Sequence, residues 1–356
     1  MHMIIDKEEI LNDLNQLMKL LQHTVGFSNN LKLMRDFYTW NEVLSYLSPS
    51  VVAEEFYITP YILKALLKQN KKSDRDYDNS IMNEQPYIEE CRQNYSELLE
   101  NINFINFRYV NHRKIFSYKE VKELILSFFN QFDNNSFKIV KSVFDESKCH
   151  IGVDFYDDFS GCCCTNLTLN KSLIFLGNEN FRLYDIMVLA HELGHYIEIS
   201  KFVLPQSKGY SFFSTFREVS SMFYEYEFLK YLQKNHFQLK STNDLLNLYY
   251  SNILEYFNAY STIMSEEFYD EETLSDTIIY SMGPYMALHF SELKKQDYKR
   301  FECIFNNFIS NIDIGNFETL MKISEFNIED FLSGDLIKDT IKEDFTLMKK
   351  QYKVGI

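Results

Sequence analysis

The sequence predicts a mainly helical fold with one small β-sheet. The chain of 356 residues contains only 10 glycines and 5 prolines, so it offers few places for tight turns. Apolar residues recur at helical spacing through most of the chain, as in EEILNDLNQLMKLLQ near the N-terminus. Residues 150–176 depart from this pattern. They are rich in β-branched and aromatic residues, are broken by turn formers, and predict a small antiparallel sheet.

Amino-acid composition and net charge restrict the kinds of molecule that we expect the protein to bind. Hydrophobic residues make up 46% of the chain, with 32 phenylalanines, 25 tyrosines and a single tryptophan, which is enough for a sizeable core. The formal net charge is −15, and no stripe of basic residues interrupts it. We therefore expect no nucleic-acid partner, because binding to phosphates needs a basic surface.

The N-terminus and the cysteines predict a cytoplasmic protein. The first residues, MHMIIDKEEILNDLNQ, carry charges where a signal peptide needs an apolar core. No run approaches the ~18 apolar residues of a membrane span, so we expect no membrane partner. The six cysteines, three of them adjacent at 162–164, do not resemble a disulfide framework. Neighbouring strand residues point to opposite faces and converge poorly on one ion, so these three are expected to be small strand residues.

The helices can be placed from their periodicity and caps. Ser117 and Glu120 form a Ser-x-x-Glu capping box that predicts the start of a helix. The polar segment 68–80 is expected to be a surface loop, and a helix is expected over 87–102. Helical periods return after the predicted sheet and continue to the C-terminus.

One motif in the chain indicates a chemistry. Residues 187–198 read MVLAHELGHYIE, in which His191, Glu192 and His195 match H-E-x-x-H. Positions i and i+4 lie on one face of a helix, so both imidazoles can reach one ion. Glu192 can then face the water that a zinc ion makes acidic, and take its proton. The alternative interpretation is two histidines on an amphipathic helix with a solvated glutamate between them.

A third ligand is available further along the chain. Catalytic zinc takes three protein ligands and keeps a fourth position open for water. The segment KFVLPQSKGY after the motif reads as a loop, and the next helical run contains Glu218, Glu225 and Glu227. Glu218 stands 23 residues after His195, in the first turns of that helix. This spacing predicts a site with two histidines and one glutamate, with Glu225 and Glu227 as the other acids in reach.

Taken together, these segments resemble the oligoendopeptidase F and thimet oligopeptidase zinc metallopeptidases. The resemblance rests on the order and spacing of FSYKEVKELILSFFNQF, VDFYDDFSGCCC, SLIFLGN and DIMVLAHELGH, and it covers roughly residues 105–350. The segment from Glu218 to Glu225 resembles the third-ligand helix of the family. The resemblance implies a zincin-type helical fold, Glu218 on the zinc, and Ser221 and Glu225 as its partners on the helix. For Glu225, a surface position is the alternative.

The resemblance also implies a division of the chain and a late catalytic tyrosine. Residues 1–104 correspond to a shortened N-terminal helical region, and residues 105–356 to the catalytic domain. Tyr280-Ser-Met-Gly resembles the late Tyr-x-x-Gly segment of the family. The family places a histidine shortly before that segment, whereas here no histidine occurs between His236 and His289. We therefore expect Tyr280 to stabilise the oxyanion, with Tyr269 as the second candidate.

Two further residues have expected structural roles. Glu198 is expected to be solvated, and His289 to be packed in the core.

The sequence thus predicts zinc-dependent hydrolysis of short peptides, with one Zn²⁺ per chain and Glu192 as general base. The alternative is a protein that keeps the zincin fold to bind a peptide or partner, with weak catalysis or none. The absent histidine favours this alternative, and the intact Glu192 speaks against it.

Overall fold

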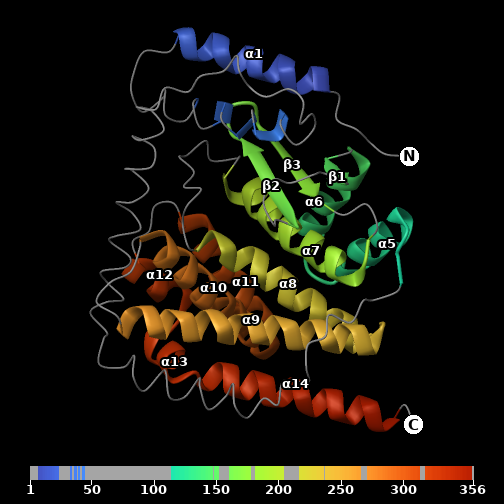
Figure 1. Ribbon diagram of the computed structural model, residues 1–356, viewed down its shortest axis with the longest axis vertical. Coiled ribbons are helices and arrows are strands. Elements are labelled where there is room, and N and C mark those ends of the chain that lie inside the picture. The colour runs from blue at the N-terminus through green and yellow to red at the C-terminus, as the bar shows by residue number, and fades with distance from the viewer. Residues whose placement is uncertain are drawn as a thin grey trace. The chain divides into compact units, whose positions relative to one another are not determined.

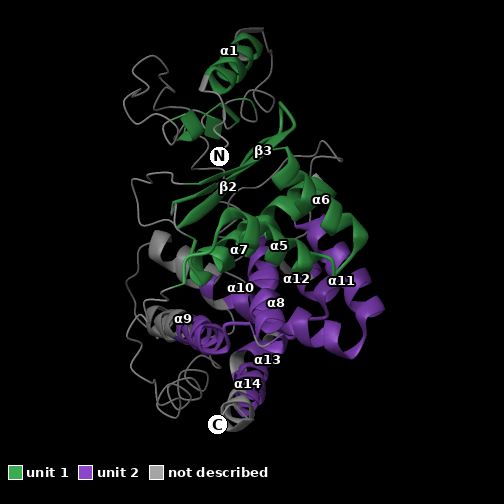
Figure 2. Ribbon diagram, turned by 90° about the vertical axis from the view of Figure 1, so that its right-hand side faces the viewer, with its two compact units in different colours: residues 1–72, 113–211 green, residues 73–112, 212–356 purple. Residues whose placement is uncertain are grey.

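The computed structural model is mainly helical with one three-stranded sheet, which confirms the predicted fold class (Figure 1). It describes residues 7–23, 33, 36–37, 39–40, 42–44, 114–146, 148–151, 160–177, 181–203, 216–235, 237–265, 271–312 and 317–354. The chain divides into two compact units (Figure 2). Unit 1 is Met1–Lys72 with Arg113–Ser211, and unit 2 is Ser73–His112 with Phe212–Ile356. The predicted boundary at residue 104, the predicted loop 68–80 and the predicted helix 87–102 lie outside the described residues.

Unit 1 contains the sheet and the helix of the zinc motif. Its elements are α1 (Lys7–His23), α5 (Tyr118–Phe129), α6 (Asn134–Asp145), β1 (Cys149–Ile151), β2 (Gly161–Asn166), β3 (Lys171–Leu176), α7 (Leu183–Glu198) and the π-helical turn η2 (Ile199–Val203). The predicted capping box at the start of α5 is confirmed. The backbone N–H of Glu120 donates to Ser117 Oγ at 3.3 Å, and the Glu120 carboxylate accepts from the Ser117 N–H at 2.8 Å.

Unit 2 is a set of helices around an aromatic core. Its elements are α8 (Arg217–Lys234), α9 (Leu239–Ser265), α10 (Glu271–Gln296), α11 (Tyr298–Asn311), α12 (Phe317–Ser324), α13 (Ile328–Ser333) and α14 (Asp335–Val354). Phe223 of α8 stacks on Phe301 of α11 with 5.1 Å between ring centroids. The buried carboxylate of Asp344 accepts from Tyr250 Oη at 2.6 Å and from Tyr226 Oη at 3.2 Å, so α14 is tied to α9 and α8. No helix among the described residues is long and apolar enough to cross a membrane.

The sheet has the strand order β1-β3-β2. β2 and β3 pair antiparallel with Cys163 opposite Ile174, as predicted. β1 departs from the prediction of an antiparallel sheet, because it pairs parallel to β3 with Cys149 opposite the same Ile174. The prediction missed this pairing because a short strand before a hairpin can dock on either edge and in either direction. Within the described residues β3 is therefore central, and β2 lies at an edge.

The three adjacent cysteines lie in β2, as predicted, and alternate between the faces of the sheet. Cys163 shares a face with Ile174 and Cys149, its partners in register. Cys162 and Cys164 lie on the opposite face with their sulfurs 3.7 Å apart. That opposite face packs on the N-terminal part of the chain, and the Cys163 face is turned to α7.

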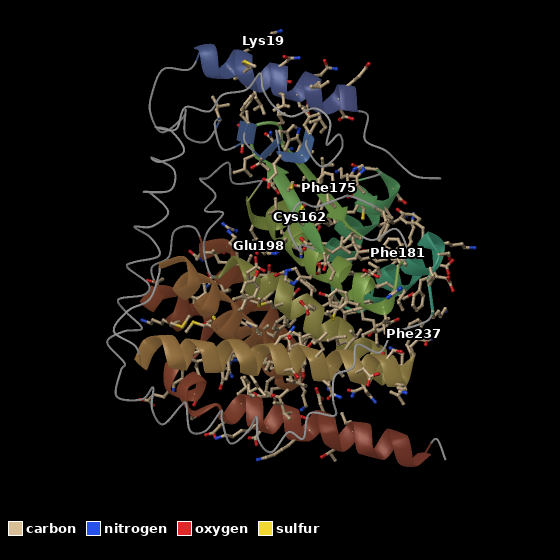
Figure 3. All side chains as sticks on the ribbon, viewed as in Figure 1. Lys19, Cys162, Phe175, Phe181, Glu198 and Phe237 are labelled. Carbon is tan, nitrogen blue, oxygen red and sulfur yellow. The ribbon has the colours of Figure 1, made fainter. Side chains whose placement is uncertain are left out.

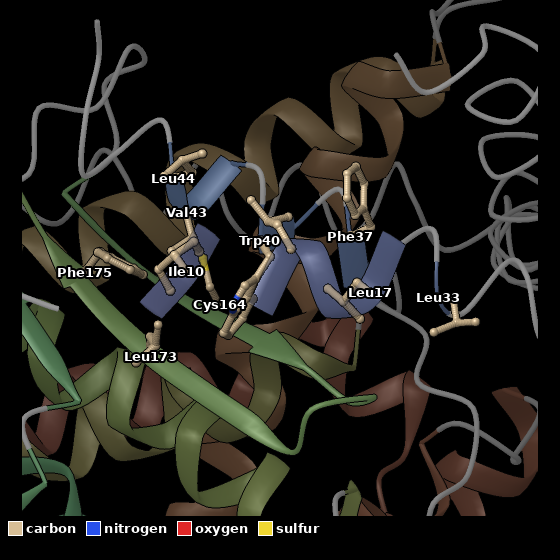
Figure 4. Close-up of a cluster of buried hydrophobic side chains, with 11 residues drawn as sticks. Ile10, Leu17, Leu33, Phe37, Trp40, Val43, Leu44, Cys164, Leu173 and Phe175 are labelled. Atoms are coloured by element: carbon tan, nitrogen blue, oxygen red, sulfur yellow. The ribbon is translucent and has the colours of Figure 1, made fainter. Parts of the chain in front are cut away.

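The N-terminal residues form a hydrophobic cluster on the outer face of the β2–β3 hairpin (Figure 4). Its buried members are Ile10, Leu14, Leu17, Leu33, Phe37, Trp40, Val43, Leu44, Cys164, Leu173 and Phe175. Polar contacts fix the same arrangement. Asp13 accepts from Trp40 Nε1 at 3.1 Å and from Lys171 Nζ at 2.7 Å, and Asp36 accepts from the backbone N–H of Thr168 at 2.7 Å. The N-terminal helix therefore belongs to the same packed unit as the sheet.

This packing predicts unequal effects for two leucines of α1. Leu14 is 0% exposed and lies in the cluster, whereas Leu20 is 38% exposed. Leu14→Ala should lower the free energy of unfolding by about 2–5 kcal/mol, because it removes buried methyl groups and leaves a cavity. Leu20→Ala should change it by less than about 0.5 kcal/mol. Urea denaturation followed by the fluorescence of Trp40, the single tryptophan, measures both. Equal effects of the two changes would contradict the placement of α1.

Candidate metal centre

The two motif histidines lie on one face of α7. Their ring centroids are 5.1 Å apart, and the rings meet edge to face at 76°. Both side chains are half-buried. The helix starts where the Asp185 carboxylate accepts a hydrogen bond from the Arg182 N–H at 2.7 Å. The predicted i, i+4 placement of His191 and His195 is what a shared metal ion requires.

Glu192 is buried in α7, with 6% of its surface exposed. Its charge acts on two thiols on the sheet face that is turned to α7. Burial and, second, the negative charge of Glu192 raise the pKa of Cys149 to about 12. The same two causes raise the pKa of Cys163 well above its usual value. Glu192 is thus a buried acid on the helix that packs against the sheet.

The sheet approaches the motif helix closely at Gly161, the first residue of β2. A Cβ atom at this position would lie 2.9 Å from Val188 Cγ1 and 3.2 Å from the carbonyl oxygen of Phe175. A Cβ atom does not tolerate such short distances, so only glycine at position 161 allows β2 to pack this closely against α7. Val188 lies one turn before Glu192, so the contact fixes the strand near the motif.

Glu198, labelled in Figure 3, contradicts the prediction that it is solvated. Only 2% of its surface is exposed. The helix does not end at this point. It continues into the π-helical turn Ile199–Val203, where a loop was expected from residue 201, and the chain around Glu198 stays covered. Glu198 also lies seven residues after His191, on the same side of the helix.

Glu218 lies in the first turn of α8 and is half-buried. The hydroxyl of Ser221, one turn later, donates to the Glu218 backbone carbonyl at 2.8 Å and is 3.2 Å from Glu218 Oε2. Ser221 is fully buried, so its hydroxyl holds the carboxylate in a restricted position.

The other two acids of α8 lie in different surroundings. The carboxylate of Glu227 accepts from Ser291 Oγ and forms an ion pair with Lys294, both on α10. Glu225 is half-buried and lies seven residues after Glu218, two turns further on the same face of the helix. The bonds of Glu227 therefore hold α8 against α10. Glu218 and Glu225 lie on the same face of α8.

The late Tyr-x-x-Gly segment lies where α10 crosses α8. A Cβ atom on Gly283 would lie 2.9 Å from Met222 Sδ and 3.7 Å from Glu218 Cβ. The absence of a side chain at Gly283 thus allows α10 to approach α8 beside Glu218. Tyr280 is half-buried one turn earlier on α10, at the i−3 position that shares a side with Gly283. Tyr269 lies outside the described residues.

His289 is packed, as predicted. Its Nε2 is 2.9 Å from the carbonyl oxygen of Ser324, and its ring meets Phe326 edge to face at 5.5 Å between centroids. Burial lowers the pKa of His289, so the imidazole stays neutral in the core.

The candidate ligands have the chemistry of a catalytic zinc site. His191, His195 and Glu218 offer two imidazole nitrogens and one carboxylate oxygen. Two histidines with one glutamate form one of the three-ligand sets that bind zinc and leave a position open for water. The donor set therefore fits the predicted ion.

The contact at Gly161 leads to a prediction about stability. Gly161→Ala should lower the free energy of unfolding by about 1–3 kcal/mol, because the new methyl group overfills the space between β2 and α7. Val188→Ala in the same chain should restore part of this loss, since it removes the Cγ1 atom that the methyl group meets. Chemical denaturation of both single variants and the double variant measures the coupling. Strictly additive losses would show that the strand does not rest on Val188.

Comparison with known proteins places this arrangement in a known fold. No family model matches the sequence, and no curated protein matches it. Among solved structures, a protein assigned as an oligoendopeptidase F from Bacillus anthracis str. Ames is 14% identical, with a TM-score of 0.51 over 97% of this chain and 74% of that one. A peptidase structure from Chlamydophila abortus is also 14% identical, with a TM-score of 0.49 over 95% of this chain and 64% of that one. The chain therefore has the helical fold of the oligoendopeptidase F structure, as the sequence resemblance implied.

Proposed function

We propose that this protein is a zinc metallopeptidase that hydrolyses short peptides in the cytoplasm. The observation that carries the proposal is the motif helix. His191 and His195 share one face, and the buried Glu192 follows the first of them on a helix that packs against the sheet. The fold, shared with a structure assigned as an oligoendopeptidase F, supports the same activity.

The proposed metal ligands are His191, His195 and Glu218, with one Zn²⁺ per chain. When bound, zinc would polarise the scissile carbonyl and lower the pKa of the attacking water to about 7. The contact between Ser221 and the Glu218 carboxylate supports a role for Ser221 in orienting this ligand. Glu225 would accept the second N–H of a ligand histidine, the partner that such histidines usually have.

Two further residues would take part in catalysis, one by moving the proton of the attacking water and one by stabilising negative charge on the carbonyl oxygen. Glu192 would take the proton of the attacking water and pass it to the leaving amine. Tyr280 would donate its hydroxyl proton in a hydrogen bond to the carbonyl oxygen as negative charge grows there. Its place one turn before the crossing of α10 and α8 at Glu218 supports this role.

The substrate backbone would lie along β2. β3 lies between β1 and β2, and its residues Ile174–Leu176 are paired on both sides. β2 lies at the edge of the described sheet, and an extended peptide can add to such an edge through main-chain hydrogen bonds. A bound peptide analogue with no backbone contact to β2 would exclude this docking mode.

The experiment that tests the proposal measures metal and turnover together. Purified protein should contain about one zinc per chain and cleave members of a quenched-fluorescent peptide library. Removal of the metal with a chelator should abolish cleavage, and added zinc should restore it. Glu218→Ala should lose zinc, whereas Glu227→Ala, in which the acid bonded to Ser291 and Lys294 is removed, should keep it. A zinc-loaded protein that cleaves no peptide would favour a binding protein, the function that the missing histidine before Tyr280 suggests.

Glu192→Gln separates catalysis from metal binding. The amide has nearly the same shape but cannot take a proton, so turnover should fall by about 10²–10⁴ while the zinc content stays at the wild-type value. Initial rates and metal analysis on the same sample measure both quantities. Wild-type turnover by the zinc-loaded variant would place the general base elsewhere.

Tyr280→Phe tests the oxyanion donor. The change keeps the ring and removes one hydroxyl, so a packing role predicts little change in rate. Loss of a transition-state hydrogen bond predicts that kcat and kcat/KM fall together by about 10²–10³, with KM nearly unchanged. Tyr298→Phe, at an exposed position of α11, serves as the control. A wild-type kcat in zinc-loaded Tyr280→Phe would remove Tyr280 from the mechanism.

A further inference from the structure

The sulfur atoms of Cys162 and Cys164 converge on the outer face of β2. They lie 3.7 Å apart, and one thiol donates a hydrogen bond to the other. Two residues along a strand advance about 6.7 Å, so side chains that stood upright would keep their sulfur atoms about that far apart. Both side chains therefore lean toward one another. The expectation that adjacent cysteines converge poorly holds for Cys163, which lies on the opposite face, but it does not apply to this pair.

The pair lies at the border of the hydrophobic cluster that covers this face of the hairpin. Cys164 is a buried member of the cluster, and Cys162 packs against it and stays partly exposed. Such apolar surroundings oppose a lone charge. They are compatible with a divalent ion held by two thiolates, because the three charges cancel and the complex as a whole is neutral.

The distance between the two sulfurs matches a metal chelate and not a disulfide. In a tetrahedral zinc site each sulfur lies about 2.3 Å from the ion, which puts two sulfurs about 3.8 Å from each other. A disulfide needs sulfurs about 2.05 Å apart and Cβ atoms about 3.5–4.5 Å apart. Both cysteines are paired with residues of β3, which keeps β2 extended and their Cβ atoms well separated. An ion can therefore bridge the sulfurs without backbone movement, whereas a disulfide cannot form without it.

We infer that Cys162 and Cys164 form a dithiolate site for a soft divalent metal ion of the zinc and cadmium class. On binding, two S–H bonds break, two metal–sulfur bonds form, and the two protons pass to the solvent. Water or a small thiol completes the tetrahedral coordination. The site lies on the face of the sheet that is turned away from α7, and it uses none of the ligands of the proposed catalytic centre.

Cobalt(II) is the probe that tests this site. A cobalt–thiolate bond gives a charge-transfer absorption band in the near ultraviolet, whereas a site of two histidines and one glutamate contains no sulfur and gives no such band. Titration of the reduced full chain with Co²⁺ should produce the band in the wild type. The matched control Cys163→Ser, which removes the thiol of the opposite face, should keep it. Cys162→Ser and Cys164→Ser should lose it at the concentration that saturates the wild type, because each retains one thiolate of the pair.

Thermal unfolding gives a second measurement, which remains decisive if serine at the buried position 164 weakens the fold. Cd²⁺ at about 100 times its dissociation constant should raise the Tm of the wild type and of Cys163→Ser by about 5 °C more than that of Cys162→Ser, because the ion binds the pair only in the folded strand. Equal shifts in Cys162→Ser and Cys163→Ser would overturn the inference. The absence of a thiolate band in the wild type, or its persistence in Cys162→Ser, would also overturn it.

Discussion

The arrangement in unit 1 depends on the close packing of β2 against the motif helix. Glycine at 161 removes the side chain that would hold the strand away from Val188, and the sheet can then cover the stretch of α7 that carries Glu192. The inner face of β2 continues with Cys163 and Thr165, both small residues. A larger residue on this face would lift the sheet and admit water beside the carboxylate. The small residues of the strand are therefore a condition for burying an acid on this helix.

Unit 2 also contains a glycine that allows two elements to pack closely. Gly283 lets α10 approach α8 at Met222, next to Glu218, where a Cβ atom would collide with the Met222 sulfur. In both units a missing side chain brings an element against the helix that carries a candidate ligand. This explains why a chain with only 10 glycines has two of them in these places. In neither place does a positive φ require glycine, so close approach is the reason for its use.

The sequence predicts relations between residues that are close together in the chain, but it does not predict contacts between residues that are far apart in it. The capping box at Ser117, the helix of the motif and the shared face of His191 and His195 depend on residues three or four positions apart, and periodicity predicts such relations. The burial of Glu198 depends on the helix continuing as a π-turn, which no residue pattern marks. The pairing of Glu227 with Lys294 spans 67 residues, and only the fold brings them together.

Asp344 and Glu192 are two acids buried within helices, one in each unit. Asp344 accepts from two phenols and a lysine, strong donors that hold its charge in one place and tie three helices together. These bonds give the carboxylate a structural role. Glu192 is buried as well, and its negative charge is the second cause of the raised pKa of Cys149 and Cys163. Both acids are buried in helical units. The donors around Asp344 tie α8, α9 and α14 together, whereas the proposed role of Glu192 is to accept a proton beside the metal ligands.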